Sequence, residues 1–363
     1  MTRLLLHIGH PKTGTTALQS VLSSNAATLL KEASVLYPTR TEPSEYKHAL
    51  AIPWLFQADN ESIRRRAHSS GDSLKAISRK YWESLIHEMQ STSHKHVIIS
   101  AEGFWSILRR ASDQQRTIFR NTLHEHVDHI QTIAYIKSPT SYFASKLNQK
   151  LRNFRPINLP RHDYISSAIS GWEQLGFESY SWQIFDRTLL KNQDIVDDFC
   201  DKHLPIGVDC NILSRAGCEQ ANSSISNEAL AILEELTEKF PVLRDDVYDH
   251  RRPKIVSILR KADSMVGGQT RPTLKESAKA GIIQRSSDIE WLRNRGIIFP
   301  DIDTTEAKCL PSTDLPETFT CVKDFCPINT ERLAALRSTV WKPIHQLFQP
   351  SWKRLFWPQH SKP

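Results

Sequence analysis

The N-terminal segment constrains the fold more than any other part of the chain. Residues 4–8 form a short apolar run that ends at Gly9, and such a run predicts a buried parallel strand. Apolar residues then recur at helical spacing over residues 15–30. A strand, a glycine loop and a helix in this order open a βαβ unit. The chain is therefore expected to build a parallel sheet.

Strand and helix patterns alternate along the residues that follow. Short apolar runs predict further strands, and amphipathic spacing predicts the helices between them. The predicted strands are residues 97–100, 132–136 and 180–185, and the helices that follow the last two are residues 139–151 and 193–200. This alternation predicts an α/β, P-loop-like three-layer fold in which helices cover both faces of a central, mostly parallel sheet.

The pattern divides the chain into one large domain and an extension. The domain is predicted over residues 1–300 and includes a helical insert at about residues 40–95. Past residue 211 the strand signal fades, and amphipathic helices are expected at residues 227–239 and 286–295. Residues 301–363 are rich in Pro, Thr, Asp and Cys at first, which predicts a loop-rich C-terminal extension.

The tail of that extension, residues 330–363, interleaves Trp and Phe with Lys and Arg. Its prolines are expected to cut it into short pieces, because proline interrupts helices; they are Pro343, Pro350 and Pro358. The tail is expected to pack against the rest of the protein. Peripheral contact with an anionic membrane surface, or contact with a second subunit, suits the same residues. The pattern leaves the oligomeric state open.

Composition narrows the classes of partner and compartment. Among 363 residues, 47 are basic and 40 acidic, a net charge of +7 that is too mild and dispersed to predict a nucleic-acid partner. It does suit anionic small ligands. The six cysteines begin at Cys200 and include no CxxC pair, which indicates reduced thiols rather than a disulfide framework or a zinc site. With no signal-type segment and no membrane-length apolar run, a cytoplasmic protein is expected.

The loop between the first strand and helix has the residues of a phosphate site. Gly9 and Gly14 keep the GxxxxG spacing of a nucleotide P-loop, and a helix N-terminus follows them. The Lys-Ser/Thr pair that normally follows the second glycine is replaced by Thr15 and Thr16, and the lysine stands inside the loop as Lys12. We interpret the loop as an anion cradle; the alternative is a βα turn that binds nothing.

Residues 11–16, with the sequence PKTGTT, resemble the 5′-phosphosulfate loop of sulfotransferases that use 3′-phosphoadenosine 5′-phosphosulfate (PAPS), especially bacterial members. The likeness covers about residues 1–300, but only two phosphate motifs in it are specific. The resemblance implies that the chain transfers a sulfuryl group from PAPS to a hydroxyl or amine, releases 3′-phosphoadenosine 5′-phosphate (PAP) and needs no metal. It also implies that the nucleotide is bound by Pro11, Lys12, Thr13, Gly14, Thr15 and Thr16.

The second specific motif belongs to the 3′-phosphate. The resembled family has an arginine at a strand end and a serine eight residues later on the next helix; Lys137 and Ser145 have that spacing. The cation would neutralise the phosphate and the hydroxyl would donate to it. Lysine in place of arginine lacks the bidentate fork, so the selectivity for PAP is open. The alternative is an ordinary helix start with a surface lysine.

Two residues are candidates for the general base. Glu102 comes just after the strand predicted at residues 97–100, where ligands of open α/β sheets bind; the resemblance implies the same role, because several members carry Glu there. His48 is the second candidate, since related bacterial sequences often carry a histidine in that stretch. A capping or solvated carboxylate and a structural histidine are the alternatives.

The acceptor is not encoded in any recognisable motif. The bacterial resemblance favours a glycan or a lipid-linked saccharide over a small phenol. Two rival functions stay open. A P-loop kinase or NTPase would need Lys after Gly14 and an Asp near the end of the strand, where this chain has Thr15 and Glu102. A non-catalytic binding protein with the sulfotransferase fold is the other, because Lys137 departs from the motif.

Overall fold

The computed structural model describes most of the chain as two compact units. The described residues are 2–41, 47–56, 73–109, 111–152, 161–205, 212–215, 224–239, 251–268, 272–302 and 321–347. Unit 1 consists of residues Met1–Ser138, Arg161–Ala221 and Ser286–Ile302, and unit 2 of Pro139–Pro160, Asn222–Arg285 and Asp303–Pro363. Each unit is described on its own below.

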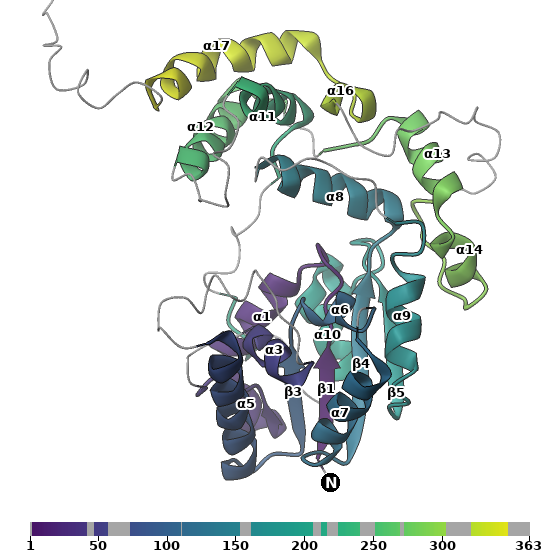
Figure 1. The fold of residues 1–363 in the computed structure, drawn as a ribbon. Coiled ribbons are helices and arrows are strands. Elements are labelled where there is room, and N and C mark those ends of the chain that lie inside the picture. The colour runs from purple at the N-terminus through teal and green to yellow at the C-terminus, as the bar shows by residue number, and fades with distance from the viewer. Residues whose placement is uncertain are drawn as a thin grey trace, which may run out of the picture. The chain divides into compact units, whose positions relative to one another are not determined.

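Unit 1 is built on a five-stranded sheet in the order β2-β3-β1-β4-β5, and every neighbouring pair is parallel (Figure 1). The strands are β1 (Arg3–His7), β2 (Val35–Leu36), β3 (His96–Ser100), β4 (His129–Ile136) and β5 (Ser179–Ile184). The predicted α/β class with a central parallel sheet is confirmed, and the sheet is parallel throughout. The chain order reverses around β1, which pairs with β3 on one side and β4 on the other.

The apolar runs form these strands because both faces of the sheet are covered. Leu5 points into a cluster with side chains of α1 (Thr15–Ser24), α2 (Ala26–Ala33) and α10 (Ile195–His203). Because side chains alternate along a strand, the equally buried Leu4 and Leu6 point to the opposite face. Figure 1 shows α7 (Asp113–His124) on that other side of the sheet from α10.

Four aromatic side chains pack together around α7. Phe56, Phe104, Phe119 and Trp172 lie with neighbouring ring centroids 4.3 to 6.3 Å apart, spacings at which edge and offset contacts are favourable. These rings tie together the elements of the predicted insert and the helices after β3 and before β5. The insert contains η1 (Ala49–Ala51), α3 (Ile52–Leu55) and α5 (Leu74–Ser91); the rings come from the end of α3, from α6 (Phe104–Ile107), from α7 and from α9 (Ser166–Glu173). The remaining elements of unit 1 are η2 (Lys191–Gln193) and α14 (Asp288–Arg293).

The single helix predicted over residues 15–30 is two helices, α1 and α2, which meet at Asn25. The Asn25 Nδ2 amide donates to the Val21 and Ser214 carbonyl oxygens at 2.8 and 3.0 Å, and Asn25 Oδ1 accepts from the Ser214 N–H at 2.8 Å. A side chain that binds its own helix and a distant backbone competes with helix continuation. The apolar spacing could not reveal that break.

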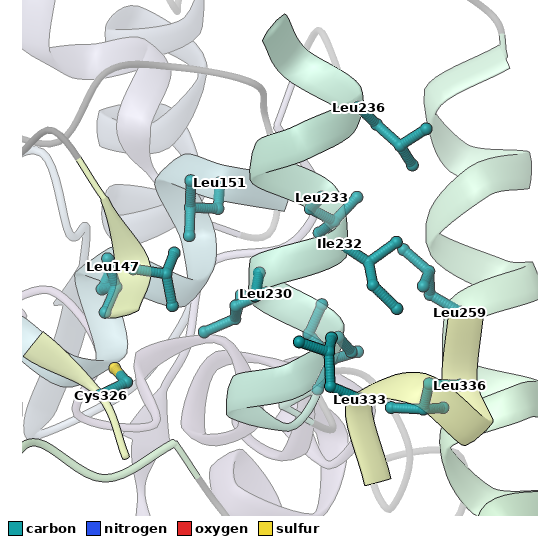
Figure 2. Close-up of a cluster of buried hydrophobic side chains, with 14 of the residues drawn as sticks. Leu147, Leu151, Leu230, Ile232, Leu233, Leu236, Leu259, Cys326, Leu333 and Leu336 are labelled. Carbon is teal, nitrogen blue, oxygen red and sulfur yellow. The ribbon is translucent and has the colours of Figure 1, made fainter. Parts of the chain in front are cut away.

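Unit 2 is helical and has its own core. Figure 2 shows leucines from α8 (Pro139–Arg152) and α11 (Asn227–Lys239) packed with Leu259 of α12 (Arg251–Val266) and with Leu333 and Leu336 of α17 (Thr330–Leu347). The unit also contains α13 (Glu276–Arg285) and α16 (Val322–Phe325). This core gathers segments that lie far apart in sequence, so the two units differ from the predicted division into residues 1–300 and 301–363.

Helix α17 contradicts the expected effect of Pro343, because it continues through that proline to Leu347. Proline removes one N–H and crowds the preceding turn. Here Val340 and Ile344, on either side of Pro343, are both buried in the unit 2 core, so tertiary packing holds the helix together. Pro350, Pro358 and the rest of the aromatic and basic tail lie outside the described residues.

Two further findings concern the described part of the chain only. No helix in it combines the length and the apolar character that crossing a bilayer requires. Its cysteines, Cys200, Cys321 and Cys326, form no disulfide.

Candidate functional site

The loop that joins β1 to α1 has an unusual backbone. Gly9, Lys12 and Gly14 all have positive φ, at +28°, +71° and +75°. A Cβ on Gly9 would lie 2.8 Å from Thr15 Oγ1 and 3.2 Å from the Glu102 Cα, so only glycine fits there. Lys12 has no such freedom, and a left-handed conformation costs a non-glycine residue about 1 kcal/mol or more. Strain of this kind is typical of functional loops.

The threonines of the loop and of the start of α1 differ in burial and in hydrogen bonding. Thr13 Oγ1 donates to the His10 carbonyl at 2.6 Å and so stabilises the loop itself. Thr15 Oγ1 is buried, and no described group hydrogen-bonds to it. Buried hydroxyls nearly always have a partner, so the unpaired Thr15 Oγ1 is an exception within this loop. Thr16 is half-buried in the first turn of α1.

The N-terminus of α1 has no side-chain cap. Its N-cap residue is Gly14, which has no side chain to accept from the first N–H groups, and the first turn has no acidic residue. The first N–H groups of a helix lack intrahelical partners and carry the positive end of the helix dipole. Together with Lys12, the loop and helix can therefore bind a phosphate group.

Glu102 lies beside this loop. The ladder between β1 and β3 extends past the strand end, where the Ala101 N–H donates to the His7 carbonyl at 3.1 Å. Glu102 follows directly, and its Cα borders Gly9. Its side chain remains accessible to solvent. Burial among surrounding groups nevertheless raises the pKa of the Glu102 carboxyl, while the Lys12 and Lys47 ammonium groups act in the opposite direction.

His48 does not have the geometry of a base. The Ser100 N–H donates to His48 Nδ1 at 3.0 Å, and His48 Nε2 lies 2.9 Å from the Pro38 carbonyl, to which it donates. Both ring nitrogens are therefore engaged with backbone groups. Burial also lowers the pKa of His48 to about 4, so the ring is neutral near pH 7. His48 is a buried tether between the segment before η1 and the end of β3.

The position of His48 explains why Lys47, which was not predicted from the sequence, lies near Glu102. Lys47 precedes His48, and His48 is bound to Ser100, two residues before Glu102. Lys47 is consequently carried to the carboxyl end of β3, where it acts electrostatically on Glu102. A basic residue next to a histidine gives no recognisable signal, because the contact depends on residues 52 positions apart.

A polar group beneath the loop was missed as well. Gln19 of α1 donates through Nε2 to the Ser100 carbonyl and hydroxyl oxygens, both at 3.0 Å. His7 Nδ1 lies 2.8 Å from the same Ser100 hydroxyl. These buried bonds fix α1 against the ends of β1 and β3 and so position the phosphate loop. Polar residues at the ends of two apolar strands were the available sign of such a group.

Lys137 and Ser145 belong to different units, and each is described within its own. Lys137 follows β4 in unit 1, and its Nζ lies 5.6 Å from the centroid of the Phe185 ring. Ser145 lies on α8 in unit 2, where its Oγ donates to the Ser141 carbonyl at 2.9 Å. Their shared role at a 3′-phosphate stays a prediction.

Within the described ranges, no group of three or more His, Cys, Asp or Glu side chains is arranged to hold a metal ion. No protein-family model matches this chain, and neither a curated protein nor a solved structure matches it. The functional inference therefore depends on the chemistry of the loop and of the residues around it.

Proposed function

We propose that the chain is a PAPS-dependent sulfotransferase that transfers a sulfuryl group to a hydroxyl or amine of an acceptor. One observation supports this most. A strained glycine loop with Lys12 lies at a helix N-terminus that has no side-chain cap, and a carboxylate with a raised pKa borders the same loop. An anion cradle and a general base side by side are what transfer of an anionic group to a hydroxyl needs.

The residues of the loop fit a phosphate. The buried Thr15 hydroxyl has no hydrogen-bond partner among the described residues, and at Gly9 the backbone lies close to its neighbours where a Cβ would clash. PAPS would supply the sulfuryl group, which leaves its phosphate oxygen as the acceptor oxygen forms the new bond to sulfur. Lys12 and the first N–H groups of α1 would bind the 5′-phosphate and neutralise the charge that builds on it.

Glu102 would take the acceptor proton. Burial raises the pKa of Glu102, which makes its carboxylate a stronger base, and the Lys12 and Lys47 ammonium groups act against that rise. The solvent-accessible side chain can pass the proton to water after transfer. With both nitrogens of His48 engaged, Glu102 is the base that the geometry favours.

A nucleotide kinase or NTPase is the second candidate. The strand order and the glycine spacing favour it, because both suit a phosphate-binding α/β domain. Its catalytic residues, however, are replaced, since Thr15 stands where the P-loop lysine is needed. A non-catalytic binding protein is the remaining alternative.

The deciding experiment is calorimetric titration of the protein with PAP, AMP and ADP, with and without Mg²⁺. We expect PAP to bind most tightly and independently of Mg²⁺. Lys12→Ala should weaken PAP binding at least about tenfold, because a charge-assisted contact is lost. The matched control is Lys31→Ala, whose exposed ammonium pairs with Glu32 and should not affect PAP.

Tighter binding of ADP with Mg²⁺ than of PAP would support the kinase instead. PAP binding without transfer from labelled PAPS to any saccharide, lipid or phenol acceptor would support the non-catalytic protein. Unchanged PAP affinity in Lys12→Ala would exclude the loop as the phosphate site.

A further inference from the structure

Aromatic rings connect the phosphate loop to α6. His10 belongs to the loop, and its ring meets Trp105 edge to face at a centroid distance of 4.7 Å and Tyr164 at 5.7 Å. Trp105 and Tyr164 lie 6.4 Å apart. His10 and Trp105 are buried, whereas Tyr164 is half-buried. The exposed part of this group is therefore on the Tyr164 side.

Arg109 lies on this exposed side. Its guanidinium carbon is 5.4 Å from the centroid of the Tyr164 ring. A guanidinium over a ring is held through its flat face, while its five N–H donors point outward in its plane. Within the described part of the chain, the Tyr164 ring is the one partner recorded for Arg109. A half-buried arginine whose donors remain available is suited to a carboxylate or a sulfate.

Hydrogen bonds to a buried carboxylate fix the backbone that follows Tyr164. The N–H groups of Ile165 and Ser166 donate to the two carboxylate oxygens of Asp288, each at 2.8 Å, and the Ser166 hydroxyl donates to the same carboxylate at 2.6 Å. Asp288 is buried. These bonds fix the backbone next to Tyr164, so Arg109 lies on a positioned ring.

Glu102, the proposed base, and Arg109 lie at opposite ends of the short helix α6. The Trp105 N–H bonds to the Glu102 carbonyl at 3.2 Å, α6 follows, and Leu108 keeps helical φ and ψ of −67° and −20°. The backbone keeps helical φ and ψ from Gly103 to Leu108, so Glu102 precedes this helical stretch and Arg109 follows it. The seven positions from one to the other rise about 10 Å at helical geometry, so a ligand that contacts both Glu102 and Arg109 must be extended.

We propose that Arg109 selects an extended, anionic acceptor. It would bind a carboxylate or sulfate group of that molecule while the reacting hydroxyl lies at Glu102. An acidic oligosaccharide has this form, and a small phenol cannot reach both residues. The inference deepens the proposed sulfotransferase function and rests on it for the role of Glu102.

The test compares two saccharides that differ in charge alone. Hyaluronan tetrasaccharide and its carboxyl-reduced, neutral form are titrated into the protein, both without PAP and with saturating PAP. We expect the acidic form to bind at least about tenfold more tightly, the effect of a charge-assisted pair. Arg109→Ala should abolish this preference, and Arg109→Lys should keep part of it because the charge remains without the fork.

Arg161→Ala is the matched control, because Arg161 is exposed, pairs with Asp163 and lies three residues from Tyr164. It should keep the preference, and so should Tyr164→Phe, which retains the ring. Equal binding of the two saccharides by the wild type, or an unchanged preference in Arg109→Ala, would overturn the inference.

PAP titration of the same variants separates this inference from the proposed function. If PAP binds normally and the charge preference is absent, the acceptor inference alone fails. If the charge preference persists and PAP does not bind, the sulfotransferase proposal fails while Arg109 remains a site for acidic saccharide.

Discussion

The two units each contain a cluster of charged side chains, and the clusters differ in how fully their members pair. In unit 2, Arg332 donates through all three guanidinium nitrogens, to Glu228 at 2.8 Å, to Asp263 at 2.6 Å and to neighbouring carbonyl and hydroxyl oxygens. In unit 1, the phosphate loop has a strained lysine and a buried hydroxyl to which no described group hydrogen-bonds.

The difference indicates different uses of buried polarity. The Arg332 network joins α11, α12 and α17, and a buried group whose hydrogen bonds are complete contributes to a unique packing. A buried hydroxyl with no hydrogen-bond partner, next to a strained backbone, lowers the stability of the free protein. It therefore suits a site that a ligand completes. Substitutions in both units test this contrast.

Glu102→Gln should give the largest loss in transfer. Glutamine keeps the size of the side chain but cannot take the acceptor proton, so the rate should fall by about 10²–10⁴-fold with PAP affinity unchanged. Transfer of label from PAPS across saccharide, lipid and phenol acceptors measures the rate. Active Glu102→Gln together with inactive, folded His48→Ala would reverse the two roles.

Arg332→Met should give the largest loss in stability. It leaves the Glu228 and Asp263 carboxylates, 5% and 0% exposed, without their cation, which costs about 3–5 kcal/mol in buried pairs. Hydrogen exchange in α11 and α12 and urea unfolding measure the effect. Arg337→Met is the control, because its pair with Glu235 is more exposed and contributes about 1 kcal/mol or less. Equal effects of the two substitutions would show that the network is dispensable.

Thr15→Val should weaken PAP binding without lowering the stability of the free protein. Removing an unmet buried hydroxyl should leave the free protein as stable as before or more stable by about 1 kcal/mol. PAP binding should weaken about fivefold to tenfold through the lost hydrogen bond. Thr13→Val should instead destabilise the protein, since Thr13 bonds to the His10 carbonyl. A stability loss in Thr15→Val as large as that in Thr13→Val would contradict an open site.

Lys47→Ala should have the smallest effect, a shift in the pH dependence of transfer. The rate should rise with pH as Glu102 loses its proton, and burial raises the pKa of that carboxyl above the ordinary glutamate range. Lys47 opposes this rise, so its removal should move the acid limb to higher pH. Lys31→Ala should leave the limb in place. A shift to lower pH, or no shift, would remove Lys47 from the site.

Elements with a local signal could be predicted from the amino-acid sequence. Residues 4–8 predicted β1 because a strand covered on both faces must be apolar throughout, and the same reasoning predicted β3 and β4. The glycine loop between residues 9 and 14 was predictable since its backbone conformation requires particular residue types. Glu102 could be expected near that loop because parallel strands end at one edge of the sheet.

Only the tertiary structure decided the features that depend on distant residues. Asn25 interrupts a helix through residue 214, and Pro343 fails to interrupt one because its neighbours are buried. His48 is a tether rather than a base since Ser100 and Pro38 occupy both of its nitrogens. Tyr164 contacts His10 of the β1–α1 loop, Arg109 lies over Tyr164, and Lys47 acts on Glu102, all through contacts between residues distant in sequence. Spacing along a sequence reports local geometry, whereas the partners of a polar side chain are set by the packing of the whole unit.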